Sequence, residues 1–132
     1  MATTHMDDDD ELWSNHDGGS GHDEPPPWQP GDRGRALTYW DTLDDTGRRV
    51  HGYLFADPGR RISGSEIVAE LDLDPSGTKN AAKVMSGSLN RAGAAGAAAG
   101  RCYPYRWWKT PDGTVYAVKY EMAEIFSVAL SL

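Results

Sequence analysis

Apolar residues recur at helical spacing in the middle of the chain. Four of them lie at i, i+3, i+4 and i+7, the pattern of a helix with one apolar face: Ala36, Tyr39, Trp40 and Leu43. A second helix is predicted over 46–56, because Asp44 or Asp45 can cap its first turn. The proline and glycine of Asp57-Pro58-Gly59 then end it, since both residues break helices.

The clearest local signal is a capping box at Ser63-Gly64-Ser65-Glu66. The Ser63 hydroxyl is expected to accept a hydrogen bond from the Glu66 amide, while the Glu66 side chain reaches back to the start of the helix. The short helix that follows is predicted to end near Asp72. The run Asp74-Pro75-Ser76-Gly77 is typical of a turn.

A third helix is predicted from a cap at Ser76 to about Ala92. Its two faces separate well. The inner face is apolar or small: Ala81, Val84, Met85, Ser88 and Ala92. The outer face is polar: Lys79, Lys83, Ser86 and Asn90. Residues 93–100 are all glycine or alanine and are expected to form a frayed continuation or a close-packed turn, because glycine weakens a helix.

The last third of the chain predicts a β-hairpin and a closing helix. Residues 103–109 and 114–120 are mainly aromatic or β-branched, and they flank Thr110-Pro111-Asp112-Gly113, a strong hairpin turn. A helix is predicted from about Glu121, with one apolar stripe: Met122, Ile125, Phe126 and Ala129. The expected class is therefore α+β, mainly α with a small β-hairpin.

Residues 1–34 are predicted to be a disordered acidic tail, and residues 35–132 a single domain. Asp7 to Glu11 is a run of five acids and residues 25–27 are all proline, so few apolar groups offset the entropy of ordering. Leu12, Trp13 and Trp28 are the apolar exceptions. Residues 1–5 have the look of a cloning leader, with Met6 as the expected natural start.

Charge is distributed unevenly along the chain. The formal net charge is -7, from 13 Lys and Arg against 20 Asp and Glu. Nine of those acids and no base lie in the first 32 residues, which leaves 13 bases against 11 acids, a net of +2, in the remainder. Between Asp74 and Asp112 there is no acid, but six bases: Lys79, Lys83, Arg91, Arg101, Arg106 and Lys109. An acidic tail beside a domain with a basic face is the expectation.

The order of these elements, two helices at a turn followed by a hairpin, resembles a winged helix-turn-helix domain. The residues that carry the resemblance are Ile62 to Leu73 and Ser76 to Gly93. More narrowly, the chain resembles a family of small, uncharacterised winged-helix-like proteins of high-GC bacteria, through three segments: Pro58-Gly59-Arg60-Arg61, Tyr103-Pro104-Tyr105-Arg106-Trp107, and Tyr116 with Glu121 to Phe126. The resemblance implies a winged helix-turn-helix with an extra C-terminal helix.

That fold implies double-stranded DNA as the partner, with the third helix in the major groove and the hairpin wing on the backbone. The expected contact residues are Lys79, Asn80, Lys83, Ser86, Asn90, Arg106, Trp108 and Lys109. Asn can read adenine, Lys can read guanine, and the other bases suit phosphates. Interleaved aromatics can stack on nucleic acid. Core packing is preferred for Tyr103, Tyr105 and Trp107, which leaves Trp108 as the aromatic to test.

Other functions are weighed against DNA binding. The alternative is a winged-helix protein-interaction module, since fold alone does not dictate function. The C-terminal stripe either forms a homodimer or closes the core. The tail has three open roles: a solubilising extension, a segment that folds over the basic face and competes with DNA, or a peptide docked by another protein. Deletion of residues 1–32 tests the second role: tighter DNA binding with a preserved fold supports competition, and unchanged affinity rejects it.

No catalytic, metal or cofactor site is expected, and the protein is not predicted to be an enzyme. The four histidines lack the spacing of a zinc site, and the single Cys102 has no recognisable histidine partner. A lone cysteine fits a reducing cytoplasm, which is the expected location. No apolar run reaches membrane-spanning length, and no segment resembles a signal peptide, so no membrane partner is expected.

Overall fold

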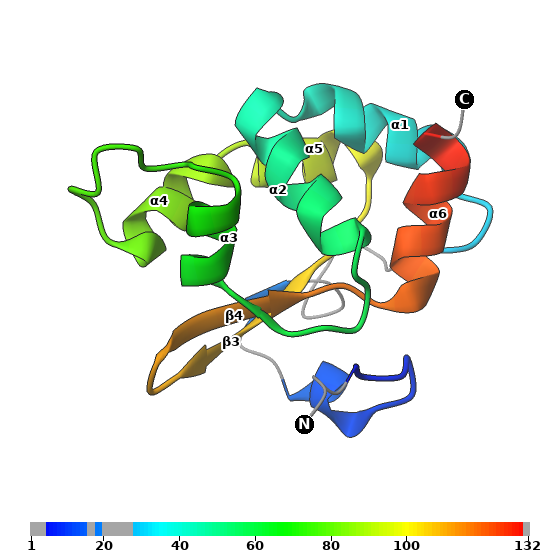
Figure 1. The fold of residues 1–132 in the computed structure, drawn as a ribbon. Coiled ribbons are helices and arrows are strands. Elements are labelled where there is room, and N and C mark those ends of the chain that lie inside the picture. Colours follow the sequence, from blue (N-terminus) through cyan, green and yellow to red (C-terminus); the bar gives the residue numbers. More distant parts are fainter. Residues whose placement is uncertain (1–4, 16–17, 20–27, 131–132) are drawn as a thin grey trace.

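The computed structural model describes residues 5–15, 18–19 and 28–130 and confirms the α+β class. The elements in chain order are the 3-10 helix η1 (Glu11–Ser14), β1 (Gly18–Gly19), α1 (Arg33–Thr42), α2 (Asp45–Phe55), β2 (Ile62–Ser63), α3 (Gly64–Glu70), α4 (Ala81–Ser88), α5 (Ala92–Ala99), β3 (Arg106–Thr110), β4 (Gly113–Ala117) and α6 (Tyr120–Leu130). The α-helices gather on one side of the β3–β4 hairpin, and the N-terminal segment lies on the other side (Figure 1).

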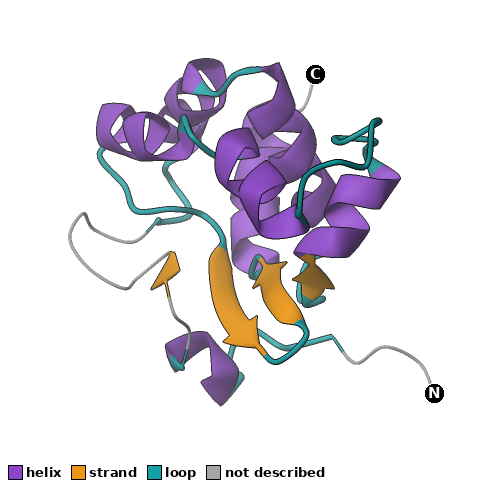
Figure 2. Ribbon diagram, turned by 90° about the vertical axis from the view of Figure 1, so that its left-hand side faces the viewer, coloured by secondary structure: helices purple, strands orange, loops and turns teal. Residues whose placement is uncertain are grey.

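The sheet is antiparallel, with strand order β1-β3-β4-β2. The predicted hairpin turn is confirmed: Thr110 pairs with Gly113, whose φ of 119° lies in the region that favours glycine. Because side chains alternate along a strand, the hairpin has two faces. The inner face, toward the helices, carries Trp107, Lys109, Thr114 and Tyr116, and the outer face carries Arg106, Trp108, Val115 and Ala117. Figure 2 shows the hairpin below the helical layer.

The main core is aromatic and lies between the helices and the inner face of the hairpin. The ring of Phe126 contacts the rings of Tyr39 and Phe55, with centroids 5.7 and 4.7 Å apart. The predicted packing role of Tyr105 is confirmed, because its side chain is buried and its ring lies 5.3 Å from that of His51. Edge-to-face and stacked ring pairs of this kind stabilise a core beyond the area they bury.

The Gly/Ala run is a helix, which corrects the expectation of a frayed end or a turn. Residues 92–99 form α5, and it packs along α1. A Cβ at Gly96 would lie 2.9 Å from the Arg101 carbonyl oxygen, so glycine is required there for the chain to turn back on itself. The two glycines of α5 cost helix propensity, but its alanines are the best helix formers, and both residue types are small enough for this close packing. Alanine propensity and tertiary contact together offset the cost of the glycines in this segment.

The third helix is shorter than predicted at both ends. α4 begins at Ala81 and ends at Ser88, and its cap is Asn80 rather than Ser76. The Asn80 Oδ1 accepts a hydrogen bond from the Lys83 amide at 2.8 Å, whereas the Ser76 hydroxyl contacts Asp74 and Thr78 in the preceding loop. An asparagine cap satisfies the same orphan amide as a serine cap, so Asn80 starts the helix four residues later than expected.

The first residues of the domain lie earlier in the chain than predicted. Trp28 is only 5% exposed, and its ring contacts those of Tyr39 and Phe126. Its indole N–H donates to the Cys102 carbonyl oxygen at 2.7 Å. The Asp32 carboxylate accepts from Arg101 at 2.7 Å. Burial raises the pKa of Asp32, but the hydrogen bonds from Arg101 and the Gln29 amide, together with the charges of Arg101 and Arg35, outweigh it, so that the net shift is downward. Residues 28–34, assigned by sequence to a disordered tail, therefore belong to the folded domain.

His51 is fully buried and neutral. Its Nδ1 lies 2.8 Å from the Gly47 carbonyl oxygen, so this nitrogen carries the proton, and its Nε2 accepts from the Tyr39 hydroxyl at 2.8 Å. Burial lowers the pKa of His51 to about 4 from its ordinary 6.5, against a smaller opposing effect of the hydrogen bond to Gly47. The ring therefore serves the core as a bridge between α1 and α2.

The buried state of His51 predicts acid sensitivity. Its folded pKa lies below its unfolded pKa, so the stability it supports is complete above pH 6.5 and decreases as the pH falls to about 4. The slope is about 1.4 kcal/mol per pH unit, or about 3 kcal/mol over the whole window. Urea unfolding between about pH 5 and 6.5 should show this slope in the native protein, and a His51→Gln variant should lose most of it. An unchanged slope in the variant would contradict the assignment.

Candidate nucleic-acid interface

α4 is anchored by its inner face and leaves its outer face open, as predicted. Val84, Met85 and Ser88 are buried, and the Ser88 hydroxyl donates to the Val84 carbonyl oxygen at 2.8 Å. Lys83 and Ser86 are exposed on the opposite side of the helix. Lys79 is exposed in the loop before the helix, where its amide donates to Asp74. The basic side chains of this segment therefore face outward at the N-terminal end of α4.

The open side of α4 is bordered by two clefts. A cleft of about 540 Å³ lies toward the start of α2, with lining residues that include Asp44, Thr46, Leu73, Lys79 and Lys83. A second cleft, of about 320 Å³, separates α4 from the inner face of the hairpin, with Ser86, Trp107, Lys109 and Tyr116 among its lining residues. Lys109 is exposed at the hairpin end of this second cleft. α4 therefore lies between two clefts, with Lys79 and Lys83 lining one and Lys109 lining the other.

α3 is held in place by an ionic cluster at its start. The Ser63 hydroxyl accepts from the Glu66 amide at 3.0 Å, which confirms half of the predicted capping box. The Glu66 carboxylate instead accepts from Arg60, at 2.6 and 3.1 Å, and from the Tyr53 hydroxyl at 2.8 Å. These hydrogen bonds, that of Arg60 first, lower the pKa of Glu66. The cluster joins α2, the 57–61 turn and α3, so it fixes the helix against which α4 packs.

The two asparagines predicted to contact DNA, Asn80 and Asn90, lie in different places in the structure. Reading adenine needs both the Oδ1 and the Nδ2 of an asparagine. The Oδ1 of Asn80 is used as the helix cap, so this side chain is committed to folding. Asn90 is exposed but lies beyond the end of α4, in the turn where its amide donates to the Gly87 carbonyl oxygen. Neither residue therefore lies on the outer face of the helix, where the sequence pattern had placed Asn90.

Arg106 and Trp108 lie on the outer face of the hairpin, away from α4. Trp108, the aromatic expected to be exposed, is only 8% exposed. Its ring lies 5.8 Å from that of Trp13, and its indole N–H donates to the Leu12 carbonyl oxygen at 3.1 Å. Arg106 lies over the Trp13 ring at 5.5 Å and donates to the Trp13 carbonyl oxygen at 3.1 Å. The expectation of an open Trp108 is therefore wrong in this structure.

The segment that covers this face is residues 5–15, termed the strap below. The described part of the predicted disordered tail is thus packed on the domain, and the rest of that prediction lies outside the described residues. The Met6 amide donates to the Gly59 carbonyl oxygen at 2.8 Å. The Asp8 carboxylate accepts from the amides of Tyr120 and Glu121 at 2.7 and 2.9 Å, which caps α6. The apolar residues Leu12 and Trp13, directly after the acidic run, are the sequence signal for this contact.

The six bases of the acid-free stretch therefore do not form one patch. Arg101 is used inside the fold, in its ion pair with Asp32. Arg106 is covered by the strap, and burial lowers the pKa of its guanidinium. Lys79, Lys83, Arg91 and Lys109 are exposed. Three of these four, all except Arg91, line the clefts beside α4.

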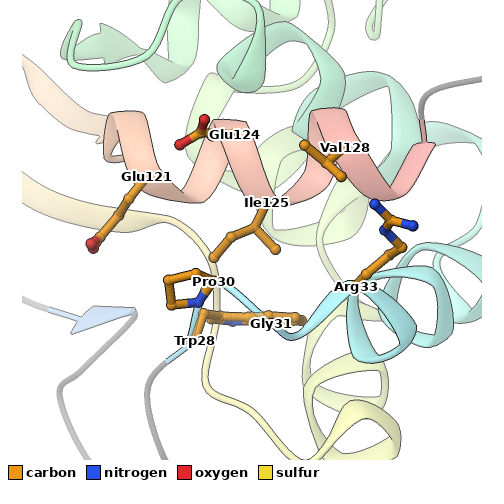
Figure 3. Close-up of a pocket in the computed structure, with 8 residues that line it drawn as sticks. All are labelled: Trp28, Pro30, Gly31, Arg33, Glu121, Glu124, Ile125 and Val128. Atoms are coloured by element: carbon orange, nitrogen blue, oxygen red, sulfur yellow. The ribbon is translucent and has the colours of Figure 1, made fainter.

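A separate pocket lies beside α6. It measures about 580 Å³, and its lining residues are Trp28, Pro30, Gly31, Arg33, Glu121, Glu124, Ile125 and Val128. In Figure 3, Ile125 points from α6 toward Pro30 and Trp28. The predicted stripe of α6 is buried in the core, whereas Val128, on the other side of the helix, is 46% exposed. The stripe thus closes the core, and the outward side of α6 borders this pocket.

No helix in the described ranges combines the length and the apolar character needed to cross a membrane.

Comparison with known proteins gives one match. The family described as "Family of unknown function (DUF6416)" matches residues 33–131, from the start of α1 to the end of α6, and leaves the strap outside. Neither the curated proteins nor the solved structures give a match. Because the match covers most of the chain, the protein belongs to the family of unknown function DUF6416.

Proposed function

We propose that this protein is a small winged helix-turn-helix DNA-binding protein of the bacterial cytoplasm, a transcriptional regulator or a nucleoid-type binder. In this proposal α3 supports α4, α4 enters the major groove, and the β3–β4 hairpin serves as the wing on the phosphate backbone. Lys79 and Lys83 contact DNA from the α4 side, and Lys109 contacts it from the hairpin. Ser86 and Asn90 make further polar contacts with DNA in this arrangement.

The observation that carries the proposal is the set of exposed lysines around α4 and the neighbouring hairpin. Lys79, Lys83 and Lys109 are all exposed and line clefts on the two sides of one short helix. No acid lies between Asp74 and Asp112 in the sequence, and Asp44, from the start of α2, lines the same cleft as Lys79 and Lys83. The major groove of DNA admits an α-helix, and lysines at its ends are suited to phosphates.

The arrangement favours phosphate contact over the reading of bases. Asn80 is committed to the helix cap, and α4 has only eight residues. Side chains that reach phosphate supply affinity that does not depend on sequence, and this affinity falls with salt because counterions are released. We therefore propose binding with weak sequence preference, closer to a nucleoid-type binder than to an operator-specific regulator.

The test is the affinity of the full chain for a labelled random duplex at several salt concentrations. With about three phosphate contacts, the slope of log K against log salt is expected to be about -3. Fluorescence anisotropy between about 50 and 200 mM salt covers the useful range. No binding at the lowest salt would refute the proposal, and binding with a slope near zero would refute the phosphate contacts.

A second candidate function is protein interaction through α6, favoured by the exposed Val128 beside the pocket that includes Ile125 and Trp28. The simplest partner is a second copy of the chain. Light scattering over a range of protein concentrations should then detect a dimer, and Val128→Asp should dissociate it without unfolding the domain. A monomer at every concentration would remove the homodimer from consideration.

A further inference from the structure

We propose that the strap is an autoinhibitory segment: it occupies the outer face of the hairpin, and DNA must displace it to reach Arg106 and Lys119. This inference rests on the proposed DNA-binding function and adds its regulation. It selects one of the three roles left open for the acidic segment. The strap lies beyond the residues that match the family, so this device is attached to the domain rather than built into its core.

The strap and DNA would use the same cations. Arg106 and Lys119 both lie over the Trp13 ring, at 5.5 and 5.9 Å from its centroid. Burial lowers the pKa of each, and the proximity of Arg106 lowers that of Lys119 further. Two positively charged side chains held close together beneath the strap favour the binding of an anion. The strap supplies negative charge through its run from Asp7 to Glu11, and a phosphate backbone would supply it in the same place.

The strap is held by contacts separate from the main core. Met6, Trp13, Trp108 and Ala117 form their own small buried cluster on the outer face. In the described part of the chain, the polar contacts of the strap with the domain include His5 with Asp57, Met6 with Gly59, Asp8 with the start of α6, and the bonds from Arg106 and Trp108 to strap carbonyl oxygens. A segment of this kind can open while the rest of the domain stays folded.

The expected strength of inhibition follows from the fraction of molecules in which the strap is closed. If the strap is closed in about nine molecules of every ten, the apparent affinity for DNA is lowered about tenfold. DNA displaces the strap in the native chain as well, so the bound state and its phosphate contacts are the same with and without release. Release should therefore raise the affinity and leave the salt slope similar.

Release is tested in the full chain by Asp8→Asn with Trp13→Ala, which removes the α6 cap and the aromatic anchor. The matched control is Asp9→Asn with Glu11→Gln. Both control side chains are exposed and belong to the same acidic run, and the control removes more charge than the release variant does. Release should tighten binding to a random duplex about tenfold. The control should change affinity by about twofold at most, the effect of charge alone.

A second measurement uses the native sequence, so it does not depend on a variant that must fold. The indole N–H signals of Trp13 and Trp108 in an NMR spectrum report the closed strap, because both groups donate hydrogen bonds there. Saturating random duplex should shift both signals, and the Trp108 signal should move toward its position in the release variant, in which Trp13 is replaced by alanine. DNA binding without movement of either signal would overturn autoinhibition.

The outcomes separate this inference from the proposed function. DNA binding of equal strength by the native chain and the release variant overturns the inference and leaves the proposed function standing. An equal gain in the release variant and the control also overturns it, since charge alone would then account for the effect. Absence of DNA binding in every form refutes the proposed function itself.

Discussion

Replacement of Trp28 by alanine is expected to destabilise the domain by about 3–5 kcal/mol. The side chain is almost fully buried between the rings of Tyr39 and Phe126, so its removal opens a cavity in the aromatic core. It also leaves the Cys102 carbonyl oxygen without the indole donor 2.7 Å away. Since a domain of this size has a free energy of unfolding of about 5–15 kcal/mol, the loss is a large part of the total.

The measurement is urea unfolding of the full chain, followed by circular dichroism. Trp28→Phe should cost less, about 1–2 kcal/mol, because the ring packing is kept and only the hydrogen bond to Cys102 is lost. The neighbouring Gln29 has an exposed side chain, so Gln29→Ala should stay within about 0.5 kcal/mol of the native protein. A loss below about 1 kcal/mol for Trp28→Ala would show that residues 28–34 do not belong to the core.

This result also bears on how the acidic segment is removed. A deletion of residues 1–32 would take away Trp28 and the Asp32–Arg101 ion pair together with the strap. Its effect on DNA binding would then mix autoinhibition with unfolding. Substitutions within the strap separate the two, because the described contacts of Trp13 and Asp8 with the domain are to the outer face of the hairpin, Lys119 and the start of α6.

Charge reversal at Lys79 and Lys83 is expected to weaken DNA binding about 100-fold. Two of about three phosphate contacts become repulsive, so the salt slope should fall from about -3 to about -1. The fold should survive. Lys83 is the third residue of α4, a position near the helix N-terminus where a glutamate is favourable, and the first turn of α4 has no acid at present. Fluorescence anisotropy with a random duplex measures the effect.

A matched control carries the same change of net charge on other surfaces. Arg33 and Arg61 are exposed and do not line the clefts beside α4. Arg33→Glu with Arg61→Glu should weaken binding by less than about fivefold, through long-range charge alone. Equal losses in the two double variants would contradict an interface at α4.

Local signals in the sequence were sufficient for much of the fold. The spacing of Ala36, Tyr39 and Leu43 predicted α1, the Ser63 hydroxyl caps α3 as expected, and the turn at 110–113 joins β3 and β4. Each of these features depends on residues close together in the chain. The exposure of Lys79, Lys83 and Ser86 also follows from local periodicity, which is why this part of the candidate site was predictable.

The features that sequence missed depend on contacts between distant segments. Trp28 is ordered by Tyr39, Cys102 and Phe126, and none of these lies within ten residues of it. Likewise, nothing near Trp108 in the sequence indicates that Trp13 covers it. An acidic, proline-containing composition predicts disorder on average, but a few buried aromatics can order part of such a segment.

The most direct measurement of the central claim is an amide NMR titration of the full chain with a random DNA duplex at low salt. DNA binding through α4 and the wing predicts the largest shifts at residues 79–90 and at the hairpin tip, 109–113. Shifts centred on α6, around Val128, or no shifts at all, would contradict it.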